Sequence, residues 1–67
     1  MDEKKNCKHV IATFLYVEDE IISFWLLRKD YDNNYVEYFD SIDDMMLAWI
    51  RYKCSGVTCT IAVYNEI

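Results

Sequence analysis

Proline is absent from the 67 residues, and glycine occurs once, at Gly56. The chain therefore has no linker of the flexible or proline-rich kind, and one glycine cannot form a glycine-rich phosphate-binding loop. The longest uninterrupted apolar run, Met45 to Ile50, is too short to cross a bilayer. We expect a single domain over residues 1–67, with the mostly polar residues 1–6 frayed.

Cysteine and histidine are scarce. Three cysteines are an odd number, and the apolar stretch after Lys8 ends in Glu18-Asp19-Glu20 without a cleavage site for a secretory signal. A disulfide framework is not indicated, so we expect a reducing, cytoplasmic setting. His9 is the only histidine, and no Ser-His-Asp or Cys-His-Asn set can be built around it. We expect no enzymatic activity and no cofactor.

Zinc binding is an alternative. Cys7, His9, Cys54 and Cys59 provide three thiols and one imidazole, which is a zinc-ligand set by number. However, Cys-x-His is an unusual chelating pair, and buried free cysteines are common in protein cores. A small zinc-stabilised module therefore stays open beside the main expectation of no metal.

Apolar residues make up 54% of the chain and aromatic residues 16%, which is typical of a folded domain. Runs of β-branched and aromatic residues predict strands over 9–17, 21–29 and 35–39, separated by charged or Asp/Asn-rich breaks. The segment 57–64 alternates apolar and polar residues and predicts a fourth strand, with Val57, Cys59, Ile61 and Val63 facing inward.

A helix is predicted over residues 41–54, between the third and fourth strands. Its apolar residues recur at helical spacing, Ser41 is a suitable N-cap and Gly56 a suitable left-handed stop. The apolar stripe consists of Ile42, Met45, Met46, Trp49 and Ile50.

The element order β-β-β-α-β predicts an α+β fold. We expect an antiparallel meander with one helix packed on one face. The fourth strand returns into the sheet beside the first, which gives the spatial order 4-1-2-3.

The net charge of −5 argues against binding to nucleic acid or to an anionic membrane, since both are polyanions. Threading the chain up and down the predicted sheet gathers acidic residues at one end, which we call the acidic end. Its members are Glu18, Asp19, Glu20, Asp40, Asp43, Asp44 and Glu66. All seven basic residues are expected at the opposite end: Lys4, Lys5, Lys8, Arg28, Lys29, Arg51 and Lys53.

The acidic end has three interpretations. Hairpin turns and first helical turns attract Asp and Glu for local reasons, so it can be a solvated end. It can instead dock a larger basic protein, because carboxylates can take the places of phosphates in a nucleic-acid-binding cleft. A divalent-cation site is the third, although the acidic loop motif of calcium sites is missing.

Strands one and two are apolar on both faces, whereas one helix covers only one face. The uncovered face, around Trp25, predicts either a homodimer stacked sheet to sheet or a contact with a partner. The alternative is a strongly twisted sheet whose aromatic side chains are capped by tyrosines.

In size, acidity and lack of a catalytic set, the chain resembles the small proteins with which phages and mobile elements block host machinery, including anti-CRISPR proteins. This likeness is compositional, extends loosely over the whole chain and assigns a role to no residue. It implies an inhibitor that docks its acidic end into a basic cleft of a larger protein. A dimeric structural or assembly protein is the main alternative.

Overall fold

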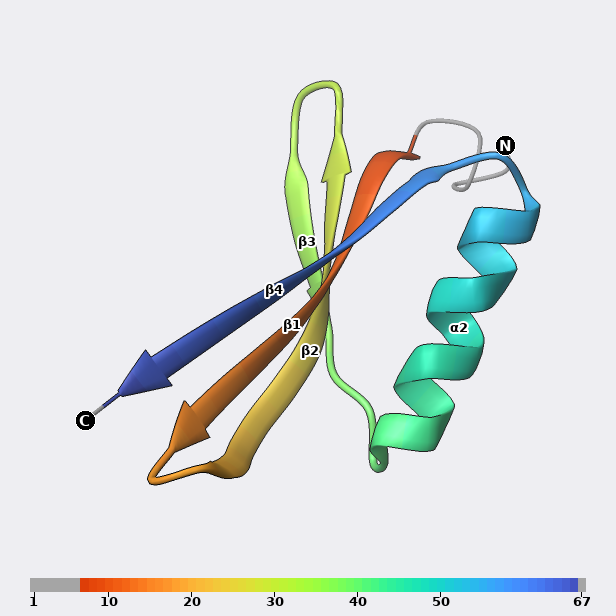
Figure 1. Ribbon diagram of the computed structural model, residues 1–67. Coiled ribbons are helices and arrows are strands. Elements are labelled where there is room, and N and C mark those ends of the chain that lie inside the picture. Colours follow the sequence, from red (N-terminus) through yellow and green to blue (C-terminus); the bar gives the residue numbers. More distant parts are fainter. Residues whose placement is uncertain (1–6, 67) are drawn as a thin grey trace.

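The computed structural model describes residues 7–66 of the chain. The elements follow in the order β1 (Cys7–Val17), β2 (Glu20–Asp30), β3 (Asn34–Glu37), α2 (Ile42–Cys54) and β4 (Thr58–Glu66). The strands form one sheet in the order β3-β2-β1-β4, and α2 lies on one side of it (Figure 1). The predicted α+β fold, element order and strand order are confirmed. The expected fraying of residues 1–6 concerns residues outside the described part.

Strand β1 pairs with a neighbouring strand on both edges over nearly its whole length. It pairs antiparallel with β2 along one edge and parallel with β4 along the other. The four residues of β3 pair antiparallel with the second half of β2. The predicted third strand is too long, because the chain leaves the sheet after Glu37 and Phe39 packs against the core instead.

Helix α2 has the caps that its sequence predicts. The Ser41 hydroxyl accepts a hydrogen bond from the Asp44 amide at 3.1 Å. At the other end, Gly56 adopts a φ of 90°, and its amide donates to the Lys53 carbonyl at 3.1 Å. A left-handed residue just past the last turn ends a helix and returns the chain to the sheet, and glycine adopts this conformation with the least strain.

The core lies between the helix and one face of the sheet. Val10 of β1, Leu26 of β2 and Met45 of α2 have no exposed surface, and Tyr52 is 5% exposed. Burial of each of these aliphatic side chains contributes about 1.5–3 kcal/mol. The helix therefore covers the face formed by the even-numbered residues of the middle of β1 and β2. We call the other side the open face.

The buried helical stripe differs from the prediction. Ile50 was expected inside but is 48% exposed, whereas Tyr52 was not in the predicted stripe and is buried. The reason is the direction in which each side chain leaves the helix: Tyr52, seven residues after Met45, lies on almost the same line along the axis, whereas Ile50 lies about 140° around the axis from Met45.

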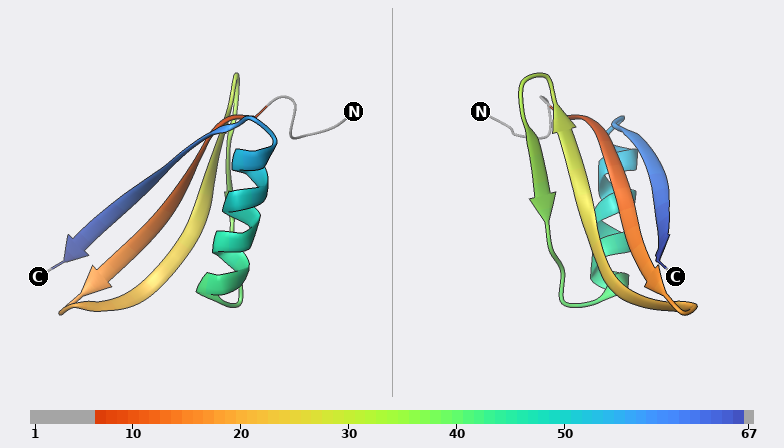
Figure 2. Two further views of the ribbon diagram at one scale, coloured as in Figure 1. Left: turned by 45° about the vertical axis from the view of Figure 1, so that its right-hand side comes forward. Right: turned by 90° about the vertical axis from the view of Figure 1, so that its left-hand side faces the viewer.

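Strand β4 diverges from α2 toward its C-terminal end (Figures 1 and 2). Its register with β1 places Ile61 beside Ala12 and Val63 beside Phe14, so both lie on the helix side as predicted. They are nevertheless 54% and 53% exposed, because β4 is an edge strand of the sheet and diverges from the helix. The prediction that they are buried is wrong.

Candidate functional site

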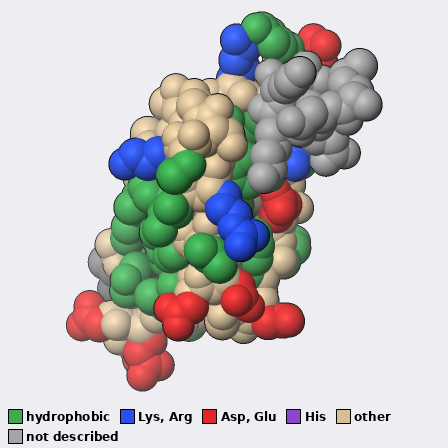
Figure 3. All heavy atoms as spheres, turned by 90° about the vertical axis from the view of Figure 1, so that its right-hand side faces the viewer, with side chains coloured by type: hydrophobic (Ala, Val, Ile, Leu, Met, Phe, Trp, Pro, Cys, Tyr) green, Lys and Arg blue, Asp and Glu red, His purple; other side chains and the backbone are tan. Residues whose placement is uncertain are grey.

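The topology gathers the acidic residues at one end of the molecule. The β1–β2 hairpin, the last residue of β4 and the start of α2 all lie there, and Figure 3 shows acidic side chains along the lower edge of the helix-covered surface. All seven predicted site residues are exposed: Glu18, Asp19, Glu20, Asp40, Asp43, Asp44 and Glu66. Within residues 7–66 none of them takes part in an ion pair, and Arg28–Glu37 is the pair that forms.

The acidic end consists of two groups. Glu18, Asp19 and Glu66, together with Asn65, line a shallow hollow of about 290 Å³ beside the hairpin. Parallel pairing explains their proximity, because Glu66 is the register partner of Val17, immediately before the turn. We call Glu18, Asp19, Glu20 and Glu66 the hairpin group.

The hairpin turn is backbone-strained. Glu18 and Asp19 have φ values of 50° and 67°, so two consecutive residues with a Cβ occupy the left-handed region. Hairpins joined by a two-residue turn of this type require this conformation, and the turn residues are usually Asn-Gly. Asp tolerates the left-handed region better than Glu does, so the strain is concentrated at Glu18.

Asp40, Asp43 and Asp44 form the second group, which we call the helix-start group. Asp43 and Asp44 lie in the first turn of α2, where the unpaired amides favour negative charge. In Figure 1 and in the left view of Figure 2 this group is separated from the hairpin, because the strands diverge from the helix.

The described basic residues occupy the opposite end, and three of them lie over aromatic rings. Lys8 Nζ is 4.2 Å from the centroid of the Tyr31 ring, and Arg28 Cζ is 5.1 Å from that of Tyr35. Lys53 Nζ lies 5.5 Å from the Trp49 ring. The other two described basic residues are Lys29, near the end of β2, and Arg51, in the last turn of α2. Lys4 and Lys5 lie outside the described residues.

A partly buried polar network joins the helix to the sheet near this basic end. The Tyr52 hydroxyl donates to Glu37 Oε1 at 2.7 Å and accepts from Arg28 Nη1 at 3.2 Å. Burial raises the pKa of Tyr52, and the hydrogen bond from Arg28 opposes part of that rise. This network was not predicted, although Tyr52 lies three residues after Trp49 and so on the same helical face.

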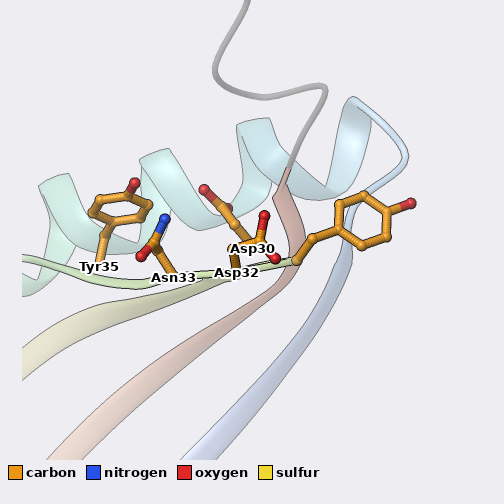
Figure 4. A pocket seen from close by; sticks show the side chains of 5 residues that line it. Asp30, Asp32, Asn33 and Tyr35 are labelled. Carbon is orange, nitrogen blue, oxygen red and sulfur yellow. The ribbon is translucent and has the colours of Figure 1, made fainter.

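A second hollow of about 290 Å³ opens on the β2–β3 loop (Figure 4). Its lining consists of Asp30, Tyr31, Asp32, Asn33 and Tyr35. The loop is held by a hydrogen bond from the Asp30 amide to the Asn33 carbonyl at 2.9 Å. Asp30 and Asp32 bring negative charge to the end where the described lysines and arginines gather, so the basic end is mixed in charge.

The proposed zinc ligands do not converge. His9 is on the open face, where its Nε2 lies 2.6 Å from Thr60 Oγ1, while Cys59 is on the helix side. Cys7 is buried in the core and Cys54 is exposed at the end of the helix. No cluster of three or more His, Cys, Asp or Glu residues suited to a metal ion occurs within residues 7–66.

On the open face, large side chains shield one another. Ile11, Leu15, Trp25 and Leu27 are all partly buried, and even Thr13 is only 3% exposed. Tyr38 lies at the margin, with its ring centroid 6.5 Å from that of Trp25 and the two ring planes tilted by 56°. The apolar residues of the sheet that are more than half exposed are Ile22 of β2 and Ile61, Val63 and Tyr64 of β4.

The fold and surface define a small α+β protein with an exposed acidic end and a mixed basic end. No protein-family model matches the chain, and no curated protein or solved structure matches it either. None of the described helices has the length and apolar character needed to cross a membrane.

Proposed function

We propose that this chain is a non-enzymatic binding protein whose acidic end docks into a basic cleft of a larger protein in the cytoplasm. The observation that carries the proposal is the exposure of seven carboxylates at one end, none of them in an ion pair within residues 7–66. The negative charge of a carboxylate that is in no ion pair is not offset within the protein, so it can attract a basic partner. Clustered charge of one sign also accelerates encounter with an oppositely charged site.

A nucleic-acid-binding cleft is the partner surface that fits best. Such clefts present Lys and Arg at intervals suited to successive phosphates, and carboxylates can occupy the same places. The separation of the hairpin group from the helix-start group supports a contact at two points. A small inhibitor of the kind that phages and mobile elements produce acts in this way when it blocks the cleft.

The test is capture of proteins from a bacterial lysate on the immobilised chain, with double-stranded DNA as competitor. Captured nucleic-acid-binding proteins should be released by DNA and by raised salt, because both weaken charge-based contacts. Substituting Glu18→Gln, Asp19→Asn, Glu20→Gln and Glu66→Gln together removes four charges while keeping side-chain size, and should abolish capture.

A control neutralises two carboxylates at the other end, with Asp30→Asn and Asp32→Asn. This control should capture the same proteins as the unaltered chain. Equal capture by the hairpin-group variant and the unaltered chain, with both shown folded by circular dichroism, would contradict the proposal.

A dimeric structural protein is the second candidate. Ile61, Val63 and Tyr64 of β4 are 54%, 53% and 58% exposed, and soluble proteins commonly bury such surface in an interface. A sedimentation profile that stays monomeric at high micromolar concentration would remove this candidate.

A further inference from the structure

We infer that the outer edge of β4 pairs antiparallel with β4 of a second copy, which joins two four-stranded sheets into one continuous sheet. This inference concerns self-association and does not rest on the partner proposed for the acidic end. It follows from the edge itself, from the side chains that the edge exposes and from the distribution of charge along the molecule.

The edge of β4 is long and unprotected. Within residues 7–66, β4 lies last in the strand order and pairs only with β1, in an unbroken register from Thr58 to Glu66. Natural edge strands are guarded by proline, lysine, a bulge or short length. The nine residues of β4, Thr-Cys-Thr-Ile-Ala-Val-Tyr-Asn-Glu, have none of these protections, and their single charge is at the end.

The opposite edge of the sheet is guarded. β3 has only four residues, and one of them is the charged Glu37. The register of β1 with β2 shifts between Leu15 and Tyr16, so a bulge disturbs β2 where β3 no longer covers it. Bulges and short strands both discourage pairing with another chain.

The side chains of β4 complement themselves in an antiparallel pair. The register that pairs all nine residues is centred on Ala62, and it places Ile61 of each copy opposite Val63 of the other. These two side chains are 54% and 53% exposed in the single chain. Cross-strand pairs of β-branched residues are among the stabilising contacts of sheets, and two such pairs form by symmetry.

Charge favours the antiparallel direction and a second copy of this chain. Glu66 and the hairpin group lie at one end of β4, and Lys53 lies just before the other end. Antiparallel pairing brings the acidic end of each copy to the mixed basic end of the other. The two Glu66 residues are then about 26 Å apart, at about 3.3 Å for each residue of a strand. Parallel pairing would place the two acidic ends side by side, which is unfavourable.

Sedimentation velocity tests the inference with the full chain under reducing conditions. The unaltered chain should show a concentration-dependent dimer over about 5 to 500 µM, a range that spans weak to moderate association. Ile61→Lys and Val63→Lys, each made singly, should raise the dissociation constant about tenfold or more, since each puts two lysines into the shared edge. Leu47→Lys is the matched control, because Leu47 is 50% exposed on the helix and should leave the dimer unchanged.

A second measurement tests the register. In a Cys54→Ser background, Ala62→Cys should give a disulfide-linked dimer on mild oxidation, because residues opposite one another in an antiparallel pair have Cα atoms about 4.5–5.5 Å apart. Thr58→Cys, on the same strand and the same side, should not, because its counterpart is far away at the other end of the ladder.

Three outcomes would overturn the inference. The first is a chain that stays monomeric at about 500 µM. The second is a dimer that survives the β4 lysine variants but is lost on Trp25→Ser, which would assign the interface to the open face. The third is equal crosslinking of Ala62→Cys and Thr58→Cys. A failure of capture by the hairpin-group variant bears only on the proposed function, so the two proposals fail separately.

Discussion

Tyr52 shows at the scale of one residue how a small core accommodates polar groups. Its ring is buried with Met45 and Leu26, while its hydroxyl lies between Glu37 Oε1 and Arg28 Nη1. The prediction from sequence placed Met45 and Trp49 on the buried helical face correctly but omitted Tyr52, because tyrosine occurs on protein surfaces as well as in cores. Only the position of β3 reveals that Glu37 is its acceptor.

Removing this hydroxyl should destabilise the fold. Tyr52→Phe removes the hydroxyl that hydrogen-bonds both Glu37 and Arg28, while these two side chains keep their ion pair at 3.5 Å. We therefore expect the free energy of unfolding to fall by about 1–3 kcal/mol. Urea unfolding followed by circular dichroism measures the change. Tyr38→Phe is the control, since that side chain is 75% exposed, and it should unfold like the unaltered chain. Equal stability of the Tyr52 and Tyr38 variants would show that the network contributes nothing.

Buried thiols should make stability sensitive to alkaline pH. Burial raises the pKa of Cys7 above its ordinary value of 9.0, and burial does the same for Cys59. The folded state then retains these protons at a pH where the unfolded state has lost them. The stabilisation is complete below about pH 9 and is lost as the pH rises through the folded-state pKa values.

Urea unfolding under reducing conditions, at a series of pH values from about 8 to 10, measures this dependence. Cys7→Ala should be less stable overall and show a shallower decline with pH, because one of the linked groups is gone. Cys54→Ala, which removes an exposed thiol, should decline as steeply as the unaltered chain. A Cys7 variant with an unchanged slope would contradict the linkage.

At the scale of elements, the β1–β2 turn combines charge with strain. The sequence located this turn at its three acidic residues but gave no sign of the positive φ values at Glu18 and Asp19, because turn residues of that kind are usually Asn and Gly. Capping residues, in contrast, made the helix predictable nearly to the residue. Ile50 was misplaced because the apolar stripe was drawn too wide: the buried face is centred on Met45 and Tyr52, and Ile50 lies about 140° around the helix axis from Met45.

Replacing this turn should separate stability from binding. Glu18→Asn with Asp19→Gly relieves the left-handed strain and should raise the free energy of unfolding by about 1 kcal/mol, while weakening capture of basic proteins. Glu18→Gln with Asp19→Asn removes the same charges, leaves a side chain at both positions and should give less stabilisation. Thermal unfolding compares the stabilities, and lysate capture compares the binding. A turn variant that is more stable and still captures basic proteins as well as the unaltered chain would show that the strained acidic turn has no binding role.

At the scale of the whole molecule, the strand order and the gathering of acids at one end followed from connectivity alone. An up-down path fixes which turns share an end, so the end that holds Glu18, Asp43 and Glu66 was predictable without any contact. The divergence of the strands from α2 was not predictable, because twist accumulates across a sheet and depends on how all four strands pack. That divergence divides the acidic end into two groups and exposes Ile61 and Val63.

The parallel pairing of β1 with β4 also bears on how the chain is synthesised. Of the four strands of this sheet the ribosome makes β1 first, and β4, one of its two neighbours, last. During synthesis β1 can form its hairpin with β2 early, whereas its other edge stays unpaired until β4, about fifty residues later in the sequence, has been made. Until β4 pairs with it, one edge of the apolar strand β1 is exposed in the nascent protein. We therefore expect that binding by a chaperone would protect the chain most before the sheet closes.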